Sequence, residues 1–135
     1  VILGSVEAAF FTLDQLRMLQ EFVSERGGGL VVLGGRRALA EGGYAGTPVA
    51  DVLPFELPRD GDTTLVEMKA EPTPLGAAHP ALQVASTVDS SGARWRSLPA
   101  LTAVNRIGAV KPGATVLLRA GTRPMLLHQR FGRGV

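Results

Sequence analysis

The fold of this chain is decided by residues 27–37, which read Gly-Gly-Gly-Leu-Val-Val-Leu-Gly-Gly-Arg-Arg. Three glycines end one element, and the four apolar residues of Leu30–Leu33 then predict a short buried strand. Gly34 and Gly35 follow at the carboxyl end of that strand. In an open α/β sheet this edge is where ligands bind and where a nucleophile would stand on a tight turn. Neither Ser nor Cys stands beside these two glycines, so the stretch indicates a fold more than an activity.

A strand and a helix are predicted upstream of this stretch. Val1–Gly4 is a short apolar run, as expected of a central parallel strand. Thr12 and Gln15 have the spacing of a capping box, which starts a helix. Apolar residues then recur at helical spacing, with Leu13, Leu16, Leu19, Phe22 and Val23 on one face. Residues 1–33 are therefore predicted to form a β-α-β unit with parallel strands and a right-handed crossover.

The chain downstream is rich in turns, with 17 Gly and 9 Pro in the whole sequence. Two short helices are predicted, over Arg36–Ala40 and over Pro48–Leu53, the second with Pro at its first position. The polar connection Phe55–Asp62 is interpreted as a subdomain boundary. Pro72–Gly76 and Ser86–Gly92 are predicted to be irregular. Strands are predicted over Thr63–Ala70, Leu101–Val104, Ala114–Leu118 and Pro124–Gln129.

Composition bounds the class of protein. A chain of 135 residues is expected to form a single domain over residues 1–135, and 45% hydrophobic with 19% charged residues argues against wholesale disorder. The net charge of +2 does not favour nucleic acid as a partner. The absence of cysteine excludes disulfides, Cys-ligated zinc and thiol nucleophiles. No apolar run approaches the roughly 20 residues of a membrane span, so no direct membrane contact is expected of this segment.

Both ends of the sequence fall at predicted strands. Val1–Gly4 opens inside one strand without an initiator Met, and Phe131–Val135 stops where another would start. We therefore expect a domain taken from a longer protein, whose other domains would be its partners.

Several blocks of the sequence resemble one bacterial family. They are Val-Ile-Leu-Gly at residues 1–4, Gly-Gly-Gly-Leu-Val-Val-Leu-Gly-Gly at 27–35 and Gly-Gly-Tyr-Ala-Gly-Thr-Pro-Val-Ala-Asp-Val-Leu-Pro at 42–54. Shorter blocks follow: Gly-Ala-Ala-His-Pro-Ala-Leu at 76–82, Trp-Arg-Ser-Leu-Pro-Ala-Leu at 95–101 and Phe-Gly-Arg-Gly-Val at 131–135. Together they are similar to the bacterial glutamine amidotransferase-like family, which belongs to the class I glutamine amidotransferase-like superfamily.

This resemblance implies an α/β fold, a flavodoxin-like three-layer α/β/α sandwich with a mostly parallel sheet, left incomplete if the chain is a fragment. It also implies a large, membrane-anchored bacterial parent protein with further domains such as von Willebrand A-like modules. Active members hydrolyse glutamine with a Cys-His-Glu triad whose Cys follows a central strand, which corresponds to Gly34 or Gly35 here. Because this chain has no Cys, we expect no glutaminase activity, no catalytic residue and no cofactor, and instead a binding or interaction module.

The predicted ligand site is the turn after Leu33 with a neighbouring loop. Unpaired amides and two arginines there would suit a small anion or a nucleotide phosphate. The alternative is that the glycines only permit a tight turn and close packing, since the pattern matches neither a dinucleotide fingerprint nor a P-loop. The site residues are Gly34, Gly35, Arg36, Arg37 and Tyr44.

Other residues have weaker functional interpretations. Asp51 is predicted either to line the same cleft as the Gly34-Gly35 turn or to cap a helix. Ser5 and His79 are candidates for a hydrolase completed by residues outside this chain, while His128 is favoured as a sheet-face residue. Two histidines far apart in sequence predict no metal site. Trp95 is predicted to pack in the core. Four arginines near the end either contact a partner domain or solubilise strand edges: Arg119, Arg123, Arg130 and Arg133.

Overall fold

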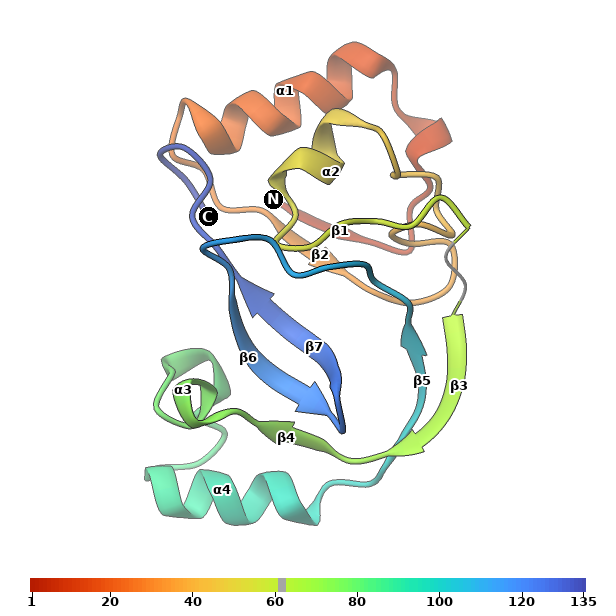
Figure 1. Ribbon diagram of the computed structural model, residues 1–135. Coiled ribbons are helices and arrows are strands. Elements are labelled where there is room, and N and C mark those ends of the chain that lie inside the picture. Colours follow the sequence, from red (N-terminus) through yellow and green to blue (C-terminus); the bar gives the residue numbers. More distant parts are fainter. Residues whose placement is uncertain (61–62) are drawn as a thin grey trace. The chain divides into compact units, whose positions relative to one another are not determined.

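The computed structural model describes residues 1–60 and 63–135, so the last two residues of the predicted Phe55–Asp62 connection lie outside it. The chain divides into two compact units (Figure 1). Unit 1 comprises Val1–Thr64, Val104–Ala114 and Gln129–Val135. Unit 2 comprises Leu65–Ala103 and Thr115–His128. The division falls within two paired strands, β3 (Thr63–Met68) and β5 (Leu101–Asn105).

Unit 1 contains the predicted β-α-β unit. Its elements are β1 (Ile2–Gly4), the 3-10 helix η1 (Ala8–Phe10), α1 (Leu13–Ser24), β2 (Val31–Leu33) and α2 (Pro48–Val52). β1 and β2 are parallel, with Leu3 opposite Val32. The capping box is confirmed, because the Gln15 amide donates to Thr12 Oγ1 at 3.2 Å and the Thr12 amide donates to Gln15 Oε1 at 2.9 Å.

The core of unit 1 lies between this small sheet and its helices. Figure 1 shows α1 and α2 on the same side of β1 and β2. Buried side chains from each of these parts meet there: Leu3, Ala8, Leu16, Tyr44 and Val49. The opposite face of the sheet stays open, since Ile2 is 71%, Val31 50% and Leu33 52% exposed. Unit 1 therefore has one helical layer, on one face of its parallel strands.

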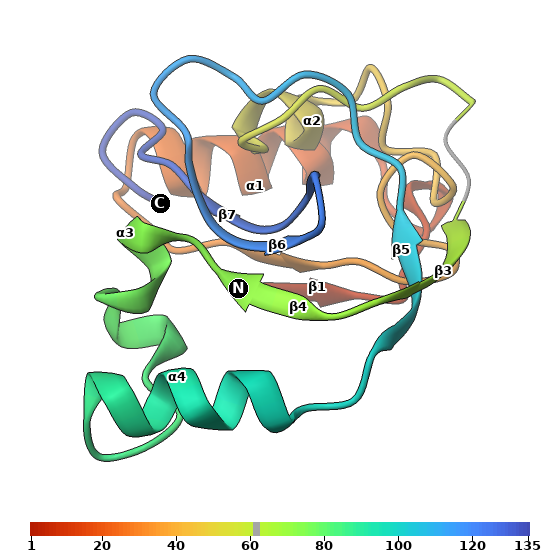
Figure 2. The ribbon, with the colours of Figure 1, turned by 60° about the horizontal axis from the view of Figure 1, so that its bottom comes forward.

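Unit 2 is built on an antiparallel sheet in the order β4-β6-β7. Its elements are β4 (Ala70–Pro72), α3 (Pro74–Ala77), the 3-10 helix η2 (Pro80–Leu82), α4 (Val88–Ser97), β6 (Thr115–Ala120) and β7 (Arg123–His128). A tight turn at Gly121, whose φ is +59°, joins β6 to β7. Figure 2 shows α4 running along β4, and the two are in contact.

The expected mostly parallel sheet is wrong. Among the described residues, strand pairing forms three small sheets, and only the β1–β2 pair is recorded as parallel. The pairs β4–β6 and β6–β7 are antiparallel, and Figure 1 shows β5 running opposite to β3. The physical reason is connection length, because a parallel pair needs a crossover of a dozen or more residues whereas β6 and β7 are joined by a tight turn.

Three local expectations also differ from the structure. Arg36–Ala40 is not a helix, because Arg37 and Leu39 have φ of +58° and +53°, in the left-handed region. Pro72–Gly76 is not irregular, since β4 ends and α3 begins within it. Ser86–Gly92 is not a loop, because α4 starts at Val88. Within the described residues, no helix is both long and apolar enough to cross a bilayer.

Candidate functional site

The turn that follows β2 is held by one side chain, Asn105 at the end of β5. Asn105 Oδ1 accepts a hydrogen bond from the Gly35 amide at 2.6 Å. Its Nδ2 donates to the Gly35 carbonyl at 2.9 Å and to Thr63 Oγ1 at 3.2 Å. The Thr63 hydroxyl in turn donates to Glu41 Oε2 at 2.8 Å. The side-chain amide of Asn105 therefore binds both the amide and the carbonyl of Gly35, as the backbone of a neighbouring strand would, and holds the turn in place.

Asn105 also fills the space in which a side chain at residue 34 would stand. A Cβ built on Gly34 would lie 2.5 Å from Asn105 Oδ1, well inside van der Waals contact. A residue with a side chain could enter there only by displacing Asn105 and breaking its two bonds to Gly35. At Gly35 there is open space, but φ of +138° is a conformation that favours glycine. Glycine is thus required at both positions for physical reasons.

The carboxyl ends of β1 and β2 carry unusual backbone conformations. Ser5, the residue after β1, has φ of +52°, and Arg37 after β2 has φ of +58°. Such conformations are costly for residues other than glycine and are concentrated at functional sites. Arg36 and Arg37 are both exposed. Arg37 Nε lies 3.6 Å from Glu7 Oε1, with the two side chains 76% and 38% exposed, so this ion pair contributes little to stability.

Tyr44 does not face solvent with the arginines. Its side chain is 2% exposed and belongs to the unit 1 core. The phenol hydroxyl donates to the Val6 carbonyl at 2.9 Å, and burial raises the pKa of Tyr44. Thr47 donates to the Tyr44 carbonyl at 2.8 Å instead of capping α2. Tyr44 therefore ties two loops together next to the turn, and the exposed part of the predicted site consists of Gly34, Arg36 and Arg37.

Asp51 lies on α2 and is used in contacts within unit 1. Its carboxylate accepts a hydrogen bond from Gln20 Nε2 of α1 at 3.2 Å. Lys111 Nζ donates to the Ala50 and Asp51 carbonyls, both at 2.9 Å. These bonds place Asp51 where α2 is fastened to α1 and to the segment after β5.

Unit 2 brings together the two histidines, which are 49 residues apart in sequence. The ring centroids of His79 and His128 are 5.9 Å apart, with the rings tilted by 48°. His79 Nδ1 accepts from the Ala81 amide at 3.2 Å and thereby caps the 3-10 helix η2. Among the residues that the structure describes, no three His, Cys, Asp or Glu side chains gather as a metal site.

A shallow hollow of about 340 Å³ also lies in unit 2, lined by residues of β4, the start of α3 and the β6–β7 turn. Glu71 and Arg119 face each other across the β4–β6 pair at its rim. Trp95, predicted for the core, is half-buried on α4, and its Nε1 donates to the Leu82 carbonyl at 2.9 Å. The sequence did not predict the hollow beside β4. Of its lining residues, only Arg119 is a functional candidate in the sequence analysis, as one of four arginines near the end of the chain.

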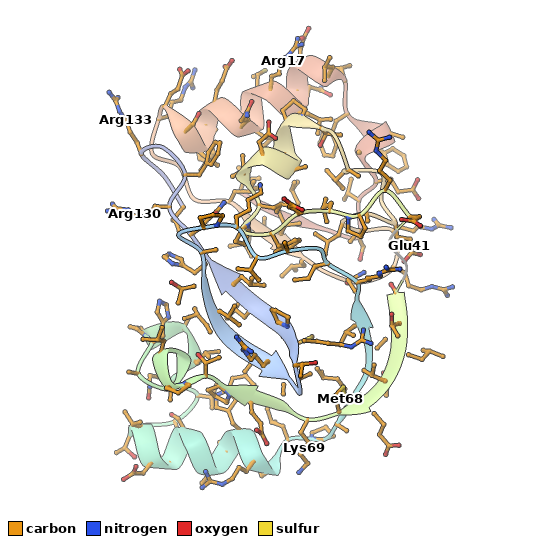
Figure 3. The ribbon with its side chains drawn as sticks, viewed as in Figure 1. Arg17, Glu41, Met68, Lys69, Arg130 and Arg133 are labelled. Carbon is orange, nitrogen blue, oxygen red and sulfur yellow. The ribbon has the colours of Figure 1, made fainter. Side chains whose placement is uncertain are left out.

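The other predicted arginines lie on the surface. Arg123 is exposed at the start of β7, and Figure 3 shows Arg130 and Arg133 pointing away from the ribbon near the C-terminus. Arg133 Nη1 donates to the Glu25 carbonyl at 3.3 Å, close to the end of α1. One of these arginines thus has a structural contact inside unit 1.

Comparison with known proteins rests on solved structures, since no family model and no curated protein matches the chain. The cytoplasmic protein STM1381 from Salmonella typhimurium LT2 matches with a TM-score of 0.80 at 21% identity, over 98% of this chain and 56% of that one. The cytoplasmic protein STM3548 from Salmonella typhimurium matches with a TM-score of 0.75 at 20% identity, over 98% and 55%. The chain therefore has the mixed α/β fold of a region that spans just over half the length of these two Salmonella proteins.

Proposed function

We propose that this chain is a non-catalytic, class I glutamine amidotransferase-like domain that acts as a binding or interaction module in a larger bacterial protein. The observation that carries the proposal is the turn after β2. By the resemblance to the superfamily, this turn corresponds to the position of the nucleophile, and glycine stands there at residues 34 and 35. Asn105 fills the space beside Gly34 and binds Gly35. A glycine offers no group that attacks a glutamine carboxamide, so no thioester forms at this turn.

The β-α-β unit of unit 1 supports the fold that this proposal assumes. The parallel β1–β2 pair with α1 crossing between the strands is the repeating unit of a flavodoxin-like sandwich. The proposed complete form is the three-layer α/β/α sandwich, of which unit 1 holds one helical layer. The similar Salmonella proteins are nearly twice as long as the matched region, which supports a parent protein with further domains.

Glutamine hydrolysis by the purified chain tests the proposal directly. Ammonia and glutamate release is measured with an active class I glutaminase as the positive control. We expect no release above the buffer rate, both for the chain and for an Asn105→Ala variant in which the space beside Gly34 is opened. Turnover by the unmodified chain would overturn the proposal, because it would require a nucleophile other than Cys.

The proposed ligand of the turn is a small anion bound by Arg36 and Arg37. Both guanidinium groups are exposed beside the Gly34–Gly35 turn, and guanidinium forks suit phosphate and carboxylate. At ten times its Kd, a ligand of the native state adds about 1.4 kcal/mol of stability, which raises Tm by about 5 °C. Thermal shifts with inorganic phosphate and with ATP test this, with Arg36→Ala/Arg37→Ala as the variant.

The control removes one arginine elsewhere in unit 1, a change of one charge against two in the double variant. Arg17 is 55% exposed on α1, paired with Asp14 at 3.1 Å, so Arg17→Ala changes net charge without touching the turn. We expect the double variant to lose the shift and Arg17→Ala to keep it. Equal shifts in all three proteins would mean that the anion binds elsewhere.

A second candidate is a hydrolase that uses Ser5. The observation that favours it is the φ of +52° at Ser5, directly after β1, a position where strained nucleophiles occur. The groups that would complete a site with Ser5 or with His79 are proposed to lie in the full-length parent, outside this chain. Ser5→Ala and His79→Ala variants of that parent test this: unchanged hydrolysis in both would remove the candidate.

A further inference from the structure

The strand β2 has one paired and one open edge. The odd-numbered residues of β2 turn their backbone groups toward β1, as the Val31 amide shows by donating to the Val1 carbonyl at 2.9 Å. The groups of the even-numbered residues point to the other edge. Among the described residues, no partner is recorded for the Leu30 carbonyl, the Val32 amide and carbonyl, or the Gly34 amide. Open edges of this kind are templates for another strand.

One residue already occupies the first position on this open edge. The Val135 amide donates to the Gly28 carbonyl at 3.2 Å, and the Leu30 amide donates to the Val135 carbonyl at 2.8 Å. These two bonds form one rung of a parallel ladder, in which Val135 lies opposite Gly29. Figure 1 shows the C-terminus beside the segment that leads into β2. The direction of any added strand is thus set as parallel to β2.

The second observation is that one apolar face of the β1–β2 sheet is exposed. Ile2, Val31 and Leu33 present apolar side chains on the face opposite α1 and α2, and Leu33 covers Gly4 there, 3.2 Å from where a Cβ would stand. Parallel strands occur almost only in sheets covered on both faces. Among the described residues, this two-stranded sheet therefore has both an open strand edge and an uncovered apolar face, which further sequence would extend and cover.

We propose that the open edge of β2 receives an extended apolar strand from further sequence of a longer parent polypeptide, running parallel to β2 from the position of Val135. The two similar Salmonella chains support this source, because about 44% and 45% of their lengths lie outside the matched regions. The added strand satisfies the free groups of Leu30, Val32 and Gly34 and gives a strand order in which β2 is central. This inference rests on the proposed role as a module of a larger protein.

The register can be derived residue by residue. Counting from Val135, the second added residue donates to the Leu30 carbonyl and accepts from the Val32 amide, because parallel rungs repeat every two residues. The first added residue turns its amide away from β2. The fourth donates to the Val32 carbonyl and accepts from the Gly34 amide. The added strand thereby also reaches the turn at which Asn105 holds Gly35.

A chain extended after Val135 by seven alternating Val and Thr residues tests this register. Proline at the second added position removes the amide that faces β2, whereas proline at the first added position removes one that faces away. Hydrogen exchange of the Val32 amide is the readout. We expect exchange to slow by about tenfold in the extended chain and in the variant with proline at the first position. With proline at the second position it should slow by less, because that proline loses the bond to the Leu30 carbonyl but keeps the carbonyl that accepts from the Val32 amide.

Two results would overturn the inference. Equal Val32 exchange rates in the original and extended chains would show that the edge does not accept a parallel strand. Association of the unextended chain into a dimer, measured by sedimentation, together with a protected Val32 amide would show that a second copy occupies the edge. Neither result bears on glutamine hydrolysis, so a failure here is distinguishable from a failure of the proposed function.

Discussion

Replacing Asn105 with Ala is expected to loosen the turn after β2. The substitution removes two hydrogen bonds to Gly35, at 2.6 and 2.9 Å, and a longer one to Thr63 at 3.2 Å. A hydrogen bond contributes about 1 kcal/mol net, so the two bonds to Gly35 amount to about 2 kcal/mol. Asn105 is half-buried, which lets water reach the freed groups and keeps the loss from being larger.

Two measurements detect this loss in the free energy of unfolding. In urea, a loss of about 2 kcal/mol moves the unfolding midpoint by about 1 M for a typical m-value. Circular dichroism is the appropriate probe, because the single Trp lies in unit 2 and Asn105 in unit 1. Hydrogen exchange of the Gly35 amide gives the local readout, and it should accelerate in Asn105→Ala.

Thr63→Val is the matched control, because it removes only the 3.2 Å bond to Asn105 and the bond to Glu41. Its loss in the free energy of unfolding is expected to be below about 1 kcal/mol, with Gly35 exchange close to that of the original chain. The reasoning is refuted if Gly35 exchanges equally fast in the original chain and in Asn105→Ala, since Asn105 would then not hold the turn.

Three further predictions concern single residues. Thr12→Ala removes the acceptor for the Gln15 amide and is expected to cost about 1 kcal/mol in urea unfolding, whereas an unchanged midpoint would argue against the capping box. Burial raises the pKa of Tyr44, the single tyrosine, so its phenolate absorbance should titrate above the ordinary value of about 10. The contribution of Tyr44 to the free energy of unfolding is present below about pH 10 and is lost as pH rises through the folded-state pKa. The Tyr44→Phe variant lacks this loss, so coincident profiles of stability against pH for the two proteins at high pH would contradict the prediction. Gly76→Ala places a Cβ against the Leu117 carbonyl backbone and is expected to destabilise unit 2 by about 2 kcal/mol or more, checked by Trp fluorescence in urea.

Elements with strong local signals could be predicted from the sequence. The helix α1 was predicted from its capping box and its apolar spacing, and α2 from Pro48 at its first position. The helix α4 was missed because Ser90, Ser91 and Gly92 suggest a loop. In the structure the Ser90 side chain closes a capping box with Thr87, and Ser91 Oγ accepts from the Ala85 amide at 3.0 Å. Serine there satisfies helix ends, which composition alone does not indicate.

The segment Arg36–Ala40 shows the opposite failure. Its Ala and Leu content favours a helix, but Arg37 and Leu39 are left-handed in the structure, and Ala38, Leu39 and Ala40 are buried. Tertiary packing overrides a weak local preference there. Packing also buries Tyr44 in the core, although the sequence predicts it in one ligand site with Arg36 and Arg37.

The sequence by itself determined which chemistry is absent and which local elements form. The lack of cysteine removes thiol catalysis whatever the fold, and caps and periodicity act between residues three or four apart. The tertiary structure alone decided how the turn after β2 is held, because Asn105 lies 70 residues from Gly35. It also decided that Val135 pairs beside β2 and that the histidines meet. Contacts over such separations depend on how the elements pack, and no local pattern of residues encodes them.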